Sequence, residues 1–89
     1  MFPNDLYLLW WGKIKENKDN VTHDMVYNNF IRYGPIQDLI VYPTCAYILF
    51  PSSKHGRDAA YNTDNHEFNG EYCQTRSFDV NSWDYILSG

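Results

Sequence analysis

Six consecutive apolar residues, Cys45 to Phe50, end abruptly at the breaker sequence Pro51-Ser52-Ser53. Their short length, aromatic content and sharp end predict a β-strand inside a sheet rather than a helix. A strand points alternate side chains to opposite faces, which separates Ala46, Ile48 and Phe50 from Cys45, Tyr47 and Leu49. Both faces are apolar, so one covers a core and the other meets a helix, a partner chain or stacked bases.

The chain has 89 residues, and a chain of this length forms one small domain with a modest core. We expect a single domain over residues 1–89, with a core at about 5–80 and an aromatic tail at 81–89. Aromatic residues make up 18% of the chain, more than one small core needs, so some are expected at a binding surface. The net charge of −4 disfavours a domain whose affinity depends on neutralising phosphates.

Two cysteines, no secretory segment and no apolar run of 18 residues predict an intracellular protein, cytoplasmic or nuclear, with no membrane contact. In that compartment Cys45 and Cys73 are expected as free thiols rather than as a disulfide.

An earlier apolar stretch, Leu6 to Trp11, predicts another strand that ends at Gly12. Tyr7, Leu9 and Trp11 alternate with Leu6, Leu8 and Trp10, and we expect Tyr7 and Leu9 on the open face of the sheet. A polar loop from Gly12 to Asn20 follows and contains Lys13, Lys15 and Lys18.

A helix is predicted from His23 to Tyr33, with Thr22 as its N-cap and Gly34-Pro35 as its stop. Val26, Phe30 and Tyr33 form its apolar stripe. The segment from Ile36 to Tyr42 predicts a strand with Leu39 and Val41 inward and Ile40 and Tyr42 outward. Pro43-Thr44 then gives a tight hairpin to the next strand.

A second helix is expected from Lys54 to Thr63, capped by Ser52 or Ser53. Asn69-Gly70 is a hairpin signal between His66–Phe68 and a last strand that begins near Glu71. The register of that strand is open: either Tyr72, Gln74 and Arg76 or Cys73, Thr75 and Ser77 face the open side. Behind Ser82 as a cap, Trp83, Ile86 and Leu87 predict one apolar helical turn that must dock on the sheet or on a partner.

The resulting order of strand, helix, strand, strand, helix, strand is the α+β, ferredoxin-like βαββαβ arrangement. It has two helices packed on one face of a four-stranded antiparallel sheet. In this order and in its motifs the chain resembles an RNA recognition motif (RRM) domain. Leu6 to Trp11 occupies the place of the first-strand motif of that family, with Tyr7 at the base-stacking position. Pro43 to Phe50 occupies the place of its third-strand motif, and the spacing from Thr22 to Ile36 matches its first helix.

Several positions depart from the family pattern. Pro43 replaces the basic residue that contacts phosphate, Thr44 replaces a glycine, and Cys45 replaces the first of two stacking aromatic residues. Trp10 stands where the first-strand motif has asparagine. Stacking contributes about 1 to 3 kcal/mol per base, so these losses are large enough to weaken RNA binding severely.

The main interpretation from sequence is therefore a non-catalytic RRM-like module that binds protein. Its partner is another chain or a second copy of itself, within an RNA-processing or ribonucleoprotein assembly. The reason for this interpretation is the apolar, uncharged open face, because an exposed apolar patch of this size would make a monomer prone to aggregation. The helix side, with His23, Tyr27 and Tyr61, is an alternative docking surface. The open face comprises Tyr7, Leu9, Ile40, Tyr42, Cys45, Tyr47 and Leu49.

The alternative interpretation is binding of single-stranded RNA by the same face. Tyr7 and Tyr47 stack bases in that case, and Lys13, Lys15, Lys18 and Arg76 contact phosphates. An enzyme is disfavoured, because His23, His55 and His66 are separated from one another and none has a visible nucleophile or base partner. No metal-ligand spacing occurs either, so neither a metal nor a cofactor is expected.

Overall fold

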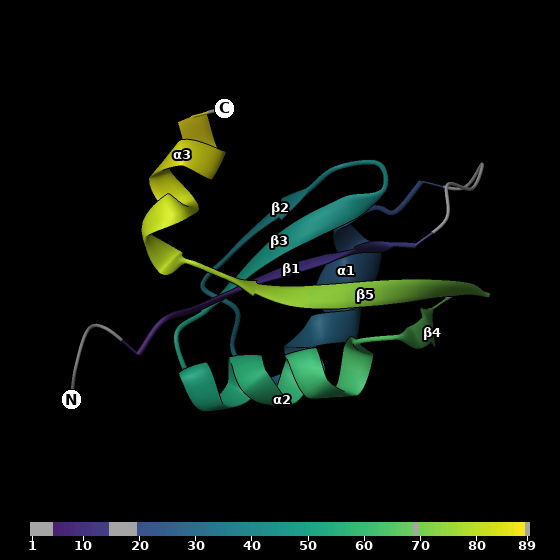
Figure 1. Cartoon of the computed structure of the whole chain (residues 1–89), viewed down its shortest axis with the longest axis horizontal. Helices are drawn as coiled ribbons and strands as arrows, with labels where there is room; N and C mark the ends of the chain where they lie inside the picture. The colour runs from purple at the N-terminus through teal and green to yellow at the C-terminus, as the bar shows by residue number, and fades with distance from the viewer. Residues whose placement is uncertain (1–4, 15–19, 69, 89) are drawn as a thin grey trace.

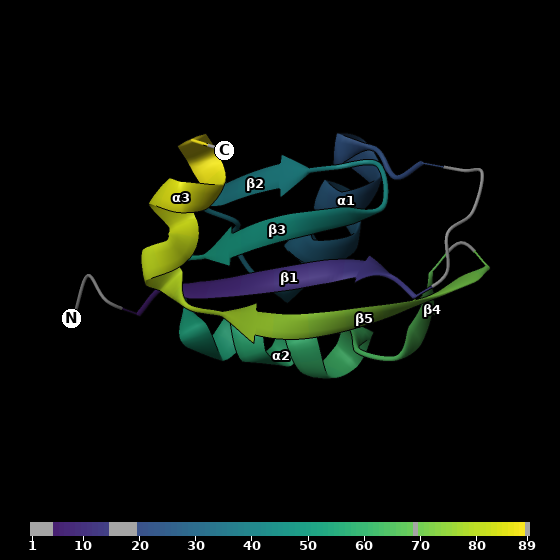
Figure 2. The ribbon, with the colours of Figure 1, turned by 45° about the horizontal axis from the view of Figure 1, so that its top comes forward.

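A computed structural model of the chain describes residues 5–14, 20–68 and 70–88. Its centre is one antiparallel sheet of five strands in the order β2-β3-β1-β5-β4, with helices α1 and α2 together on one side (Figures 1 and 2). The elements are β1 Tyr7–Lys13, α1 His23–Phe30, the 3-10 turn η1 Ile31–Tyr33, β2 Asp38–Val41, β3 Cys45–Phe50, α2 Ser53–Thr63, β4 His66–Phe68, β5 Glu71–Phe78, the 3-10 turn η2 Val80–Ser82 and α3 Trp83–Ser88.

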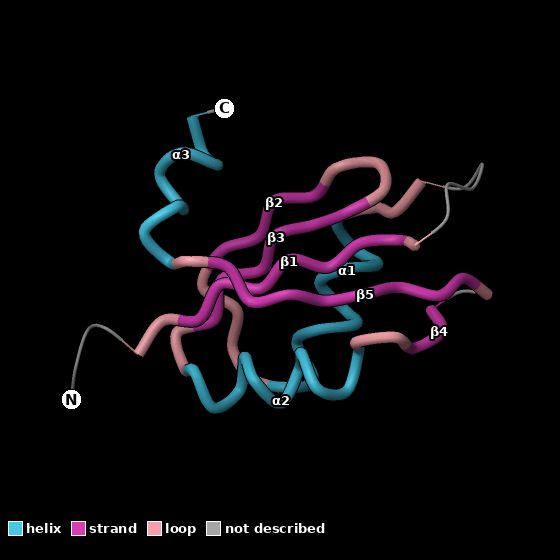
Figure 3. Tube along the Cα trace, viewed as in Figure 1, coloured by secondary structure: helices cyan, strands magenta, loops and turns pink. Residues whose placement is uncertain are grey.

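The α+β, ferredoxin-like fold expected from sequence is confirmed, with one strand more than the four predicted. The extra strand is β4, which is only three residues long and pairs with the start of β5 (Figure 3). Phe68 lies opposite Glu71 across a two-residue connection, and Gly70 has φ +81°, a conformation that favours glycine. The hairpin predicted from Asn69-Gly70 therefore forms, although Asn69 lies outside the described residues.

Both main helices begin at the residues that the sequence indicates. The Thr22 side chain accepts a hydrogen bond from the Met25 backbone N–H at 3.2 Å, which caps α1. Ser52 is the cap of α2, and its hydroxyl accepts from the His55 N–H at 3.4 Å. The α1 segment continues through η1 as far as Tyr33, so the helical region predicted from His23 to Tyr33 is confirmed.

The core lies between the sheet and the two helices. Ala46, Ile48 and Phe50 of β3 are fully buried there, as their alternation predicts. Trp11 of β1 is 1% exposed and packs edge-on against Phe30 of α1, with the ring centroids 5.8 Å apart. Burial of such large aromatic side chains supplies most of the stabilisation available to a small domain.

Candidate functional site

The face of the sheet turned away from α1 and α2 is the candidate site, and strand register decides which side chains it carries. Trp10 of β1 lies opposite Tyr47 of β3 on one side and Arg76 of β5 on the other. Because side chains alternate between the two faces along a strand, every second residue from Trp10, Tyr47 and Arg76 lies on the same face as these three. That open face carries Leu8, Trp10 and Gly12 from β1, Asp38 and Ile40 from β2, Cys45, Tyr47 and Leu49 from β3, and Tyr72, Gln74, Arg76 and Phe78 from β5.

Trp10 forms a flat platform at the centre of the open face. A Cβ atom added to Gly12 would lie 2.5 Å from the Trp10 Cζ2 atom, so the indole lies across the backbone of that glycine. Cys45 of the neighbouring strand β3 lies opposite Gly12, next to the same indole. Burial raises the pKa of the Cys45 thiol, and the Trp10 side chain opposes this only in part, so the thiol stays neutral. Gly12 is thus required for the close approach of a ring.

Tyr47 of β3 contacts two further aromatic rings, Tyr42 just after β2 and Phe78 of β5. Its ring meets the Tyr42 ring edge-on at 6.1 Å and the Phe78 ring edge-on at 5.5 Å, measured between centroids. Tyr42 and Phe78 are each 39% exposed. Burial, followed by the neighbouring Cys45 and Tyr42 groups, raises the pKa of the Tyr47 phenol, which therefore remains an uncharged hydrogen-bond donor.

Tyr7 and Leu9 do not lie on the open face, and this sequence prediction is wrong. Leu9 is fully buried in the core, and Tyr7 packs beneath α2, where its ring fills the space left by Gly56. The other five predicted members, Ile40, Tyr42, Cys45, Tyr47 and Leu49, have the expected parity. The reason for the error is that both alternating sets of β1 are apolar and aromatic, so hydrophobicity alone does not choose between them.

One end of the open face is already covered. Leu8 is 0% exposed and Leu49 is 3% exposed, although both point away from α1 and α2. Figure 2 shows η2 and α3 passing in front of the end of the sheet where β1 begins and β3 ends. The C-terminal segment therefore buries these two leucines, which leaves the aromatic residues as the accessible part of the face.

The details of this tail differ from the sequence prediction. Asp79, not Ser82, is the cap: its carboxylate accepts from the Asn81 N–H at 3.0 Å and starts η2, which runs into α3. Trp83 and Ile86 are partly buried, as docking requires, whereas Leu87 is 54% exposed. Figure 1 shows the C-terminal end of α3 projecting away from the sheet.

The cations predicted to contact phosphates are not gathered at this face. Arg76 is exposed on it, next to Trp10. Lys13 lies on the helix side with 4% of its side chain exposed, and its Nζ atom pairs with Glu71 Oε1 at 3.2 Å. Lys15 and Lys18 lie outside the described residues. In the part of the chain that is described, the strands of the open face thus present one basic residue, Arg76 of β5, and one acidic residue, Asp38 of β2.

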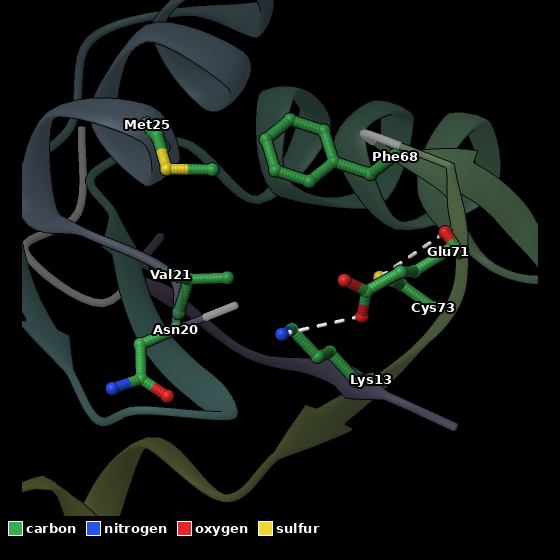
Figure 4. Close-up of a pocket in the computed structure, with 7 residues that line it drawn as sticks. All are labelled: Lys13, Asn20, Val21, Met25, Phe68, Glu71 and Cys73. Atoms are coloured by element: carbon green, nitrogen blue, oxygen red, sulfur yellow. Dashed lines mark hydrogen bonds and ion pairs between the residues drawn. The ribbon is translucent and has the colours of Figure 1, made fainter. Parts of the chain in front are cut away.

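A pocket on the opposite side of the sheet contains this ion pair. It has a volume of about 260 Å³, and Met25, Val21 and Phe68 form its apolar wall opposite Lys13 and Glu71 (Figure 4). The Cys73 thiol also lines it and is directed at the Glu71 backbone carbonyl at 3.8 Å. Within residues 5–14, 20–68 and 70–88 no cluster of histidine, cysteine and acidic side chains is arranged to hold a metal ion. Among the same residues no helix has the length and apolar character needed to cross a membrane.

Comparison with known proteins identifies the fold. No family model and no curated protein matches the sequence. The Rna15 RRM with bound RNA superimposes with a TM-score of 0.72 at 13% identity, over 91% of this chain and 95% of that one. The RRM3 domain of Mip6 gives 0.67 at 13% identity, over 80% and 91% of the two chains. The Nab3-RRM gives 0.64 at 20% identity, over 78% and 89%.

The chain folds as a divergent RRM-like domain. In this RRM-like domain the structure moves the first-strand motif by three residues. Trp10, which lies beside Tyr47, takes the outward aromatic position that the sequence suggested for Tyr7. Lys13 then takes the position of the asparagine, so Trp10 is no longer a departure from the pattern.

Sequence analysis also missed Phe78, which belongs to the open face. The alternation of the last strand could have identified it. Phe78 follows Tyr72, Gln74 and Arg76 in steps of two residues, so it lies on the open face in the first of the two registers considered. The structure selects that register: Cys73 and Thr75 are buried on the helix side, at 1% and 9% exposure.

Proposed function

We propose that this RRM-like domain binds single-stranded RNA through the open face of its sheet. The observation that carries the proposal is the pair Trp10 and Tyr47, two outward aromatic residues directly opposite each other on adjacent strands. RRM domains use aromatic residues at these two strands to stack two or three bases. Tyr42 and Phe78, on either side of Tyr47, extend the aromatic surface.

The solved structures support the same function by analogy. The Rna15 RRM is described with bound RNA, and the Nab3-RRM with recognition of cis elements of non-polyadenylated RNAs. An RNA-processing or ribonucleoprotein setting, and a non-catalytic role, are consistent with a fold whose members are binding modules.

The protein-interaction interpretation has lost its main argument. It depended on leucines that would leave the open face aliphatic as well as aromatic. Leu9 is in the core instead, and Leu49 is covered by the C-terminal segment. The accessible remainder consists mainly of rings, which suits bases better than an extended protein contact.

Binding is expected to depend on stacking rather than on charge. Cys45 and Pro43 supply neither a ring nor a cation at their motif positions, and Arg76 is the cation that accompanies Trp10 on this face. An affinity weaker than that of an RRM with a complete motif follows, because a stacked base contributes about 1 to 3 kcal/mol.

The test is a titration of the domain with mixed-sequence RNA oligonucleotides at low salt, read by fluorescence anisotropy. We expect Tyr47→Ala and Trp10→Ala each to raise the dissociation constant by about 5- to 150-fold, the equivalent of one lost stacking contact. Tyr61→Ala is the matched control, since Tyr61 is 84% exposed but lies on α2, on the other side of the sheet.

Failure of the wild-type domain to bind any RNA at low salt, where attraction to phosphates is least screened, would reject the proposal. Equal losses for Tyr61→Ala and Tyr47→Ala would also reject it, because the contact would then not be specific to the open face.

A further inference from the structure

A shallow pocket lies between α3 and the middle of the open face. Its volume is about 260 Å³, and it is lined by Tyr42, Cys45 and Tyr47 from the sheet and by Tyr85 and Ile86 from α3. We call it the α3 pocket. In Figure 2, α3 lies at the end of the sheet where β2 begins and β3 ends.

The size and lining of the α3 pocket limit what it can hold. Pockets for drug-sized ligands have volumes of about 300 to 1,000 Å³, so this pocket suits a single small ring system. None of its five lining residues is charged, and three are tyrosines whose hydroxyls can donate or accept hydrogen bonds. A neutral, flat, aromatic group with polar edges fits this chemistry, whereas a phosphate does not.

The aromatic side chain of Tyr85 is not explained by a role in stabilising the fold. Its side chain is 83% exposed, so it contributes little to holding α3 in place, which is the role of the partly buried Trp83 and Ile86. Tyr85 nevertheless lines the α3 pocket from the helix, together with Tyr42 and Tyr47 from the sheet side. An exposed ring facing a second aromatic surface across a gap gains contact area when a flat group enters between them.

We propose that the α3 pocket holds one nucleobase of the bound strand, placed between Tyr85 and the pair Tyr42 and Tyr47. This inference rests on the proposed RNA-binding function and adds to it. It makes the C-terminal helix part of the RNA site rather than only a cover for Leu8 and Leu49. Because Tyr47 borders both the pocket and Trp10, the base in the pocket is a neighbour of the base stacked at the centre of the face.

The experiment measures the affinity for RNA oligonucleotides of mixed sequence that lengthen by one nucleotide at a time. For the wild-type domain, the nucleotide that fills the α3 pocket should tighten binding by about 5- to 150-fold. In Tyr85→Ala this step should disappear while shorter oligonucleotides bind as to wild type. Tyr85→Phe should retain the step, since the ring remains.

Tyr61→Ala is again the matched control, because its ring is as exposed as that of Tyr85 and is far from the pocket in the fold. The Tyr85→Ala domain is expected to fold normally, since the side chain is largely exposed. If Tyr85→Ala shows the same length dependence as wild type, the inference is wrong although RNA binding stands. If wild type binds no RNA of any length, the proposed function fails and the inference fails with it. A wild-type dimer that Tyr85→Ala converts to a monomer would show that the pocket holds a side chain of a second copy, which also overturns the inference.

Discussion

The buried Cys73 thiol has a strongly raised pKa. It is 1% exposed on the helix side of β5, and its pKa rises from 9.0 to about 11. Burial is the largest cause, the charge of Glu71 adds to it, and Lys13 acts in the opposite direction. The buried thiol is therefore a poor nucleophile and a structural residue rather than a reactive one.

This shift predicts a loss of stability at alkaline pH. The unfolded chain releases the Cys73 proton near pH 9 but the folded chain only near pH 11, so the stabilisation is complete below pH 9 and is lost as pH rises through 11. Between these values the free energy of unfolding should fall by about 2 to 3 kcal/mol more for wild type than for Cys73→Ala. Chemical denaturation at a series of pH values measures the difference.

The comparison uses the slopes of the two pH curves, because Cys73→Ala also lowers stability at every pH by removing buried volume. Titrating tyrosines are common to both proteins and cancel. Parallel curves would show that the thiol is not shifted. Cys45→Ala, on the open face, is a second control that should change the slope less.

Two glycines help to decide which side of β1 faces the helices. Tyr7, Leu9 and Trp11 compete with Leu8 and Trp10 for the core, and the two sets are alike in size and apolarity. Neighbouring small residues separate them: Gly56 makes room for the Tyr7 ring and Gly12 for the Trp10 indole. The contact of Gly56 with Tyr7 joins α2 to β1, so it is not visible in the local pattern of β1, whereas Gly12 and Trp10 lie two residues apart in the same strand.

Among the elements, α2 is adapted to the sheet beneath it at the expense of its own propensity. A glycine inside a helix costs about 0.5 to 1 kcal/mol relative to alanine. Gly56 nevertheless lies in the second turn of α2 and is buried, because a Cβ atom there would overlap the Tyr7 ring. The packing of α2 against β1 therefore stabilises the domain by more than the lower helix propensity of Gly56 destabilises it.

Gly56→Ala should accordingly destabilise the domain by about 1 to 3 kcal/mol, the usual cost of overpacking, instead of the gain that alanine gives in an ordinary helix. Denaturant unfolding measures it. In a Tyr7→Leu background the ring is absent, so the same substitution should cost much less, and the double-mutant cycle should give a coupling of at least about 0.5 kcal/mol. An unchanged cost in that background would mean that another contact excludes the alanine.

The two edges of the sheet are partly closed by carboxylates. On β2 the Asp38 Oδ1 atom accepts from the Leu39 N–H at 2.8 Å, and beside β5 the Asp64 Oδ1 atom accepts from the Thr75 N–H at 3.0 Å, just past the end of the β4 pairing. Occupied edge donors and negative charge discourage a further strand from adding. This arrangement directs binding to the open face rather than to the edges.

For the whole molecule, the sequence was most informative where capping or breaking residues define the end of a helix or strand. Thr22 and Gly34 bounded the first helical region, Ser52 capped the second helix, and Pro51 ended β3, and each of these boundaries is confirmed. Sequence failed where the outcome depended on contacts between distant elements. These were the face chosen by β1 and the ion pair that removes Lys13 from the candidate site, whereas docking of the tail on the sheet was one of the two outcomes expected from sequence.

The distribution of charge over the whole molecule predicts how RNA binding depends on salt concentration. The chain carries a net charge of −4, and the described cations other than Arg76 lie away from the open face: Lys13 pairs with Glu71, and Arg32, Lys54 and Arg57 lie in η1 and α2. Each phosphate neutralised on a single strand changes log K against log salt by about −0.7. RNA binding by this domain should therefore depend only weakly on salt, and Arg76→Gln should reduce the slope by roughly 0.7 to 1.

Anisotropy titrations over a series of salt concentrations measure this slope. Arg57→Gln, on α2, removes the same charge from the molecule but not from the open face, and should leave the slope unchanged. If both substitutions change the slope equally, the RNA responds to the net charge of the domain and not to Arg76 beside Trp10. A steep slope that neither variant reduces would place the phosphate contacts on cations outside the open face, and the stacking residues would then account for less of the affinity than proposed.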